Sequence, residues 1–275
     1  MKPSVGSTHT RTRIHRLRPR IIALFALTAS LFLGVVFARA EGTPNGNLQV
    51  ALTGRLSPRT LPRSLPAPIS VSVSGQISTA DGAPPPQLKL LTIEINRHGR
   101  LDYTGLPLCP LSKIKLASTQ LARSSCRSAL VGKGTFSSNI VIKGEPPYPS
   151  TGQLLVFNGR EGGHQVLYGH IYDLQPFPTS FVLTFEIKSL AHGPYGTALI
   201  AHVARTLGNW GYVTGISMTL SRRFSYRGAS HSYLSSACPA PQGFPQVTFP
   251  LARAGFGFAQ QKLSATLTRT CRVRG

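Results

Sequence analysis

The segment Ile69-Ser70-Val71-Ser72-Val73-Ser74-Gly75-Gln76-Ile77 decides the fold class of this chain. Its aliphatic residues recur at alternate positions, and small or polar residues lie between them. Because successive side chains of a strand point to opposite faces, this period of two predicts a β-strand with one face in a hydrophobic core. Related patterns, rich in β-branched and aromatic residues, return in the segments 91–96, 136–142, 154–158, 166–172, 181–187, 210–220, 247–251 and 263–271.

The fold class predicted from these segments is all-β. Helical periodicity is scarce, and only the stretch 112–126 could hold a turn or two of helix. Roughly ten strands separated by turn residues are typical of a β-sandwich or a distorted barrel, which we place at 69–275. The alternative is two β lobes that divide near the proline-rich loop at 146–150.

The first forty residues have the three parts of an export signal. Residues 1–20 carry six basic side chains and no acid, residues 21–37 form an almost unbroken apolar run, and Ala38-Arg39-Ala40 follows as a small-x-small cleavage site. This order predicts a signal peptide over 1–40. Because an apolar run of this length reaches the lower limit of a membrane span, the alternative is a retained N-terminal anchor. Either segment places the rest of the chain outside the cytoplasmic membrane, either secreted or at the cell surface.

Residues 41–68 precede the first clearly alternating segment and contain five prolines. Proline fixes φ and lacks a backbone donor, so it interrupts a helix or a central strand. We therefore expect a Pro-rich linker over 41–68, or an arm at the edge of the sheet.

The chain is strongly basic. Of its 30 Lys and Arg residues seven lie in 1–40, which leaves 23 against 8 Asp and Glu, a formal charge of +15. A field of this sign favours anionic partners such as a cell-wall polymer or a membrane surface. Nucleic acid is not an expected partner, because export separates the protein from it. The alternative is that the charges form a scattered, solvated surface that reflects an arginine-rich composition.

Four cysteines follow the predicted signal, and an oxidising compartment favours their pairing into disulfides. Cys109 lies close to Cys126 in the sequence, Cys238 lies close to Cys271, and a wide gap separates the two sets. Three pairings are possible, of which proximity favours Cys109–Cys126 and Cys238–Cys271. The cysteines lack the CxxC spacing and the adjacent histidines of zinc sites, so we expect neither a metal nor a cofactor.

The sequence argues against an enzyme. Glycoside hydrolysis usually requires two opposed carboxylates, and the acids placed to form such a pair are few: Glu94, Asp102, Asp173 and Glu186. The Gly-x-Ser-x-Gly, His-Glu-x-x-His, phosphate-loop and dinucleotide-binding motifs are absent from the sequence. We expect no catalytic residues. The alternative is a secreted hydrolase that acts through His170 or a neighbour.

The stretch 210–227 is the best candidate for a binding site. Aromatic rings stack on sugars and arginine side chains pair with phosphate or carboxylate, so a mixture of the two suits an anionic glycopolymer. The candidate residues are Trp210, Tyr212, Arg222, Arg223, Tyr226 and Arg227. The alternative is that Trp210 and Tyr212 are core residues of a long strand and that the arginines begin a hairpin at Arg227-Gly228.

Five short motifs carry a resemblance to a known group of proteins. They are Gly105-Leu106-Pro107-Leu108-Cys109, the segment 129–134, Phe157-Asn158-Gly159-Arg160, the segment 210–215, and Ser232-Tyr233-Leu234 ahead of Cys238-Pro239. From about Gly105 the chain resembles an uncharacterised family of secreted β-rich proteins from high-GC soil actinobacteria. The resemblance implies secretion and disulfides between neighbouring cysteines. It implies no activity, because the group has none known.

Overall fold

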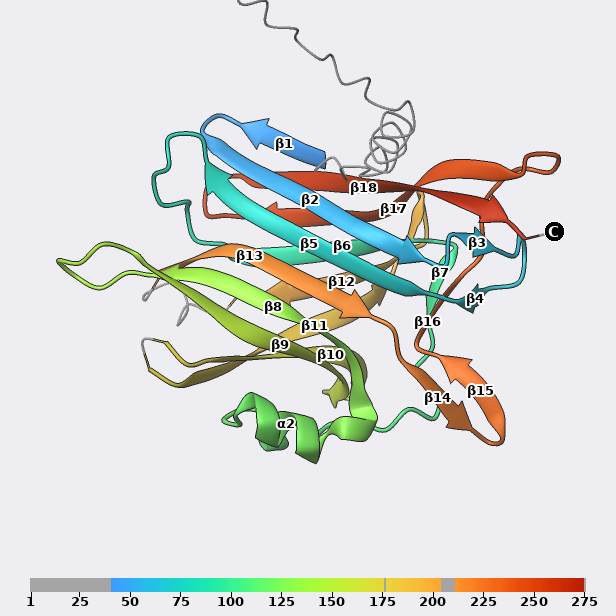
Figure 1. Cartoon of the computed structure of the whole chain (residues 1–275), viewed down its shortest axis with the longest axis horizontal. Helices are drawn as coiled ribbons and strands as arrows, with labels where there is room; N and C mark the ends of the chain where they lie inside the picture. Colours follow the sequence, from blue (N-terminus) through green and yellow to red (C-terminus); the bar gives the residue numbers. More distant parts are fainter. Residues whose placement is uncertain (1–40, 176, 204–210, 275) are drawn as a thin grey trace, which may run out of the picture. The chain divides into compact units, whose positions relative to one another are not determined.

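The computed structural model describes residues 41–175, 177–203 and 211–274, so the predicted signal at 1–40 and Trp210 lie outside the described residues. The described residues form 18 strands and one α-helix, which confirms the all-β prediction (Figure 1). The strands of the main sheet are β1 (Glu41–Asn45), β2 (Leu48–Ser57), β3 (Thr60–Leu61), β5 (Ser70–Thr79), β6 (Leu90–Asn96), β8 (Leu130–Ile140), β9 (Tyr148–Glu161), β10 (His164–Asp173), β11 (Thr179–Ser189), β12 (Tyr195–His202), β13 (Gly211–Leu220), β17 (Gln246–Gly257) and β18 (Lys262–Val273). The remaining elements are β4 (Ala67–Pro68), β7 (Gly99–Leu101), β14 (Arg223–Tyr226), β15 (Ala229–Ser232), β16 (Leu234–Ser236), the helix α2 (Thr119–Ser125) and the 3-10 turns η2 (Leu111–Lys113) and η3 (Arg127–Ala129).

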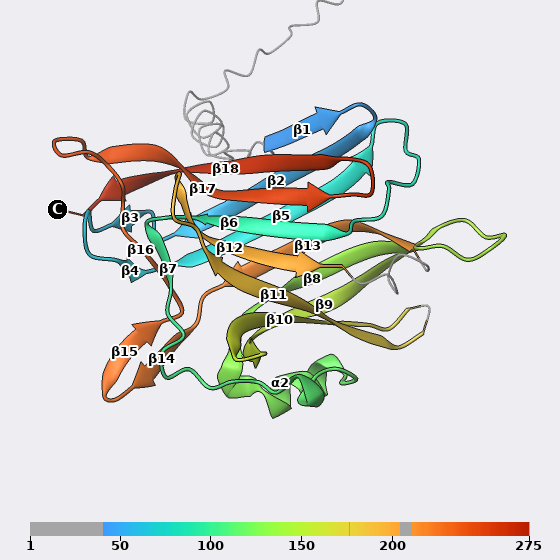
Figure 2. The same ribbon diagram turned by 180° about the vertical axis from the view of Figure 1, so that it is seen from behind.

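Thirteen strands form one sheet in the order β1-β2-β5-β13-β8-β9-β10-β11-β12-β6-β17-β18-β3. Its neighbouring strands are antiparallel except β18 and β3, which pair in parallel. The sheet curls until its ends meet, because β18 contacts both β1 and β2. Figure 1 looks onto the wall that contains β2, β5, β13 and β8, and Figure 2 onto the wall that contains β17, β6 and β12. Of the two expected forms, the structure is therefore barrel-like rather than a pair of stacked sheets.

The hairpin of β9 and β10 is buried on both of its faces. Leu154 and Val156 of β9 point into the interior of the curled sheet, whereas Leu155 and Phe157 pack in a second, smaller core on its outer face. Strands buried on both sides have continuous apolar sequences instead of alternating ones. This explains why the segment 154–158 is apolar throughout except at its last residue.

The smaller outer core is covered by the segment 106–129, which the first disulfide closes. The Cα atoms of Cys109 and Cys126 lie 5.4 Å apart, within the normal range for a disulfide. The hydroxyl of Ser118 caps α2 by accepting a hydrogen bond from the backbone N–H of Leu121 at 3.3 Å. The helical turns expected between these two cysteines are confirmed.

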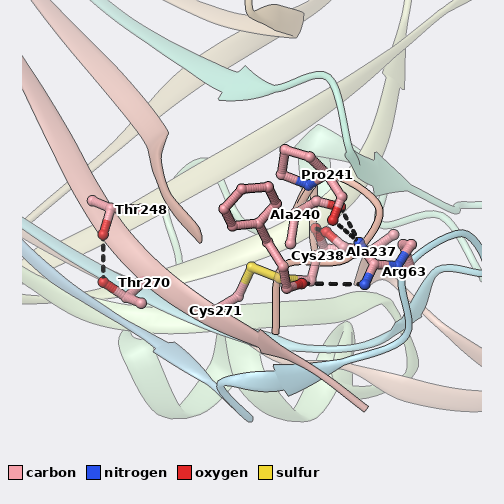
Figure 3. The surroundings of a disulfide bond; sticks show 10 residues. Arg63, Ala237, Cys238, Ala240, Pro241, Thr248, Thr270 and Cys271 are labelled. Carbon is pink, nitrogen blue, oxygen red and sulfur yellow. Dashed lines mark hydrogen bonds between the residues drawn. A yellow bond between two sulfur atoms is a disulfide. The ribbon is translucent and has the colours of Figure 1, made fainter. Parts of the chain in front are cut away.

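The second disulfide joins β18 to the loop that follows β16. The Cα atoms of Cys238 and Cys271 are 5.8 Å apart, so both predicted pairings are confirmed. Beside this bond the guanidinium of Arg63 donates to the carbonyl oxygens of Ala240 and Pro241 (Figure 3). This arginine therefore holds the loop in place, which is a structural use of one of the positive charges.

The prediction of a Pro-rich linker over 41–68 is wrong. β2 pairs with β5 along its whole length, and its inward side chains are buried: Leu48, Val50, Leu52 and Leu56. The prolines lie in the edge strand β1 or after β2, where a missing backbone donor costs little. Only the expected edge arm has a counterpart, because β1 is the first strand of the sheet.

The described residues belong to a single compact unit, which spans 39–275. The proline-rich loop leads from β8 into β9, and these two strands pair with each other, so the region 146–150 does not divide two lobes. The strands outnumber the expected ten because β1 and β2 lie in the segment expected to be a linker, and because six further strands have only two to four residues, too few to show a period: β3, β4, β7, β14, β15 and β16. Among the described residues, no helix is both long and apolar enough to cross a membrane.

Candidate functional site

The arginines of the candidate site lie on a two-stranded hairpin that extends from the curled sheet (Figure 1). We call residues 222–232 the basic hairpin. β14 and β15 pair in register from Arg223↔Ser232 to Tyr226↔Ala229. The two turn residues, Arg227 and Gly228, have φ values of 50° and 76°, as tight two-residue hairpin turns require. The hairpin that was the alternative interpretation of this stretch is therefore present.

Three rings gather on one face of the basic hairpin. Phe224 stacks on His231 with ring centroids 5.4 Å apart, and Tyr226 meets the same imidazole edge-on at 6.1 Å. The Arg227 guanidinium lies 5.2 Å from the centroid of the Tyr226 ring, within the range of a cation–π interaction. The cluster thus joins a positive charge to partly exposed aromatic surface.

Asp102 fixes the imidazole of this cluster. Its Oδ2 lies 3.0 Å from Nδ1 of His231, and its other carboxylate oxygen accepts a hydrogen bond from the backbone N–H of Thr104. Burial raises the pKa of Asp102, but the hydrogen bonds from His231 and Thr104 outweigh it and keep the pKa below its ordinary value. The carboxylate therefore stays ionised and engaged with His231 at neutral pH.

Gly105 positions the tyrosine of the cluster. Its φ of +74° favours glycine, and a Cβ atom there would lie 2.2 Å from Tyr226 Cδ2. No other residue allows the 102–106 turn to approach the ring this closely. The turn that carries Asp102 is thus fitted to the basic hairpin at two points, the ring of Tyr226 and the imidazole of His231.

The structure brings together only part of the predicted site. Trp210 lies outside the described residues, and Tyr212 sits at the far end of β13, where its hydroxyl accepts a hydrogen bond from Asn139 Nδ2 at 2.8 Å. Tyr212 and Arg222 are ten positions apart, which corresponds to roughly 33 Å of extended chain. Placing Tyr212 with the arginines is therefore wrong, because proximity in sequence along a strand is not proximity in space.

The three arginines of the hairpin also differ from one another. Arg222 is half-buried, and its Nε is enclosed without a hydrogen-bond partner, whereas Arg223 and Arg227 are exposed. Phe224 and His231 were not among the site residues predicted from the sequence. The alternation Phe224-Ser225-Tyr226 ahead of the Arg227-Gly228 turn is the signal that could have found the first of them.

A second group of arginines, on segments near the meeting ends of the sheet, was not predicted. Arg269 donates from Nε and Nη2 to the Gly54 carbonyl oxygen at 2.9 and 2.7 Å, and the backbone N–H of Arg272 donates to the Arg59 carbonyl oxygen at 2.8 Å. These bonds join the end of β18 to β2 and to the residue that precedes β3 by one position. The arginines on these paired segments form what we call the arginine seam: Arg55, Arg59, Arg269, Arg272 and Arg274. Only the meeting of the sheet's two ends gathers them.

His170, the residue of the hydrolase alternative, lies in a closed environment. Its side chain is 0% exposed, and Nε2 donates to the carbonyl oxygen of Ala117 at 2.9 Å. The Ser180 hydroxyl lies 3.2 Å from the same nitrogen, and Nδ1 has no hydrogen-bond partner. Burial lowers the pKa of His170, and the bond to Ala117 opposes this only in part. The imidazole fastens the 106–129 segment to the outer face of β10.

The outer face of the sheet also bears an open groove of about 650 Å³ above β10, β11 and β12. Its titratable lining residues are Glu161, His164, Glu186, Lys188 and His202. Lys188 already pairs with Glu186 at 3.0 Å. Within the described part of the chain, no three His, Cys, Asp or Glu side chains are grouped so that they could hold a metal ion.

The described residues thus form a disulfide-bonded all-β structure with one large curled sheet and a basic hairpin. Comparison with known protein families, with curated proteins and with solved structures finds no match. Only the residues of this chain therefore indicate its function.

Proposed function

We propose that this is an exported, non-catalytic protein of the cell envelope that binds an anionic glycopolymer through the basic hairpin. The predicted signal at 1–40 supports export. Two disulfides fit an oxidising compartment, where such bonds form and persist. The formal charge of +15 after residue 40 would attract a polyanion over a distance limited by salt.

The observation that carries the proposal is the arrangement of Arg227 over Tyr226. An exposed guanidinium held at 5.2 Å from a ring centroid is restricted in its motion, so it loses less freedom when it pairs with a phosphate or carboxylate. Arg223 adds a second exposed guanidinium on the same two-stranded element. The acid that faces this cluster, Asp102, is engaged by His231 and competes less for the arginines.

The absence of catalysis is also part of the proposal. His170 is enclosed between β10 and the 106–129 segment, and neither of its ring nitrogens contacts a carboxylate. A general base needs access to substrate and an oriented imidazole. The imidazole of His170 is held in one orientation, but a substrate cannot reach it.

Binding to purified wall teichoic acid, measured by calorimetry at low and physiological salt, tests the proposal. The variant Arg223→Gln/Arg227→Gln removes two charges from the basic hairpin. The matched control Arg123→Gln/Arg160→Gln removes two exposed charges from α2 and β9. We expect the hairpin variant to bind about tenfold more weakly, equivalent to about 1.4 kcal/mol, and the control to stay within about twofold of the parent.

A third variant, Arg59→Gln/Arg272→Gln, removes two charges from the arginine seam. Equal losses in all three variants would mean that net charge alone drives the interaction, and a selective loss in the seam variant would move the site there. No binding by the parent protein, even at low salt, would favour a structural role. Each of these results overturns the proposal for the hairpin.

A further inference from the structure

The interior of the curled sheet is not completely filled. Val71 and Val73 of β5, Ile93 and Ile95 of β6, and Ile216 of β13 occupy inward positions, yet they remain partly accessible. Side chains at such positions in well-packed proteins leave few voids larger than a water molecule. Partial accessibility of inward aliphatic side chains therefore marks a hollow between the two walls of the sheet.

Two adjoining cavities make up this hollow. The centre of a water molecule can move through about 40 Å³ of one and about 20 Å³ of the other. Both cavities are lined by the same four side chains: Val73, Ile93, Met218 and Ala252. We call the pair the interior slot. It lies between β5 and β13 on one wall and β6 and β17 on the other, the walls seen in Figures 1 and 2.

The interior slot is long and narrow. Its lining extends from Ile69, just before β5, to Gly75, which is six residue steps or roughly 20 Å of extended chain. Spread over this length, the 40 and 20 Å³ that are open to the centre of a water molecule leave a channel only about one methylene group wide. A planar ring therefore does not fit without rearrangement, whereas a single aliphatic chain matches the shape. Met218 can adapt to such a chain, because methionine is unbranched and has several rotatable bonds.

The polar groups of the slot lie at one end and are already satisfied. Asn96 Nδ2 donates to the Pro250 carbonyl oxygen at 2.8 Å, and its Oδ1 accepts from the backbone N–H of His98 at 3.0 Å. The Ser236 hydroxyl donates to the Ala237 carbonyl oxygen at 3.1 Å. Because these polar groups are already hydrogen-bonded, the slot offers a ligand only apolar contacts. An ordered water molecule would find few hydrogen-bond partners there.

We propose that the interior slot binds one unbranched aliphatic chain, supplied by a free fatty acid or by the acyl chain of a lipid. Burial of each additional methylene inside the slot then increases affinity about fourfold. The slot shares no residue with the basic hairpin, and its binding relies on apolar contact, so it does not depend on the proposed function.

Displacement of cis-parinaric acid, followed by fluorescence below its micelle concentration, tests this proposal. We expect decanoic acid to compete about fifteenfold better than octanoic acid. Neutral 1-decanol should also compete, with no change between low and physiological salt. Competition by dihexanoyl phosphatidylglycerol as well would identify lipid as a source of the chain, and competition by the fatty acids alone would identify free acids.

Two substitutions fill the slot from different walls. Ala252→Leu should weaken binding at least tenfold while thermal stability stays equal or rises, because the added atoms occupy empty space. Val73→Ile adds one methyl group, should weaken binding less, and decides the question if Ala252→Leu does not fold. The control Ala191→Leu adds the same apolar surface at an exposed loop position and should bind like the parent. No binding of the probe, or equal binding by parent and both slot variants, would overturn the proposal.

Discussion

Replacing Leu56 by alanine tests whether residues 41–68 are part of the core. Leu56 lies on β2, is 3% exposed, and is paired with Val71 of β5. The substitution removes three methylene equivalents, worth about 2.4 kcal/mol of transfer free energy, and a partly collapsed cavity adds to this. We expect the free energy of unfolding to fall by about 3 kcal/mol, which for a domain of this size corresponds to a decrease of about 6–12 °C in Tm.

The same segment offers a matched control. Leu65 is 75% exposed, so Leu65→Ala removes the same atoms from a largely solvated position and should cost at most about 0.6 kcal/mol. Urea unfolding followed by far-ultraviolet circular dichroism measures both variants, and the denaturant slope should not change. Equal and small losses from the two substitutions would refute the packing of β2 against β5 and restore the linker prediction.

Two further outcomes are expected. Converting Cys238 and Cys271 to alanine should lower the free energy of unfolding by about 3.7 kcal/mol, and converting Cys109 and Cys126 by about 3.1 kcal/mol, because the loop between Cys109 and Cys126 is shorter (17 against 33 residues). Non-reducing denaturant titrations measure both, and the opposite order would contradict the loop-entropy argument. Burial lowers the pKa of His170 from its ordinary value of 6.5, so below that value the unfolded chain takes up a proton that the folded chain resists. The contribution of His170 to the free energy of unfolding should therefore be fully present above about pH 6.5 and decrease as the pH falls through that value. A pH series of unfolding curves measures this slope, which His170→Gln should remove.

The sequence by itself determined the local features of this protein. The alternation at 69–77 identified β5, because a strand's side chains change face at every residue whatever lies beside it. Proximity in the sequence correctly predicted the two disulfides, because the ends of a short loop stay close together. The sequence also indicated the turn at Arg227-Gly228, because a tight hairpin needs residues that tolerate positive φ.

Only the tertiary structure decided which strands are neighbours and what they enclose. β5 pairs with β2 and with β13, which lies more than a hundred residues away, and no local pattern encodes that choice. The same long-range pairing forms the arginine seam and the interior slot. It also places Tyr212 far from the arginines of the hairpin, and it makes β2 part of the core despite the prolines around it. A period of two shows that a strand has an inner face, whereas the partner of that face depends on how the whole sheet curls and where its two ends meet.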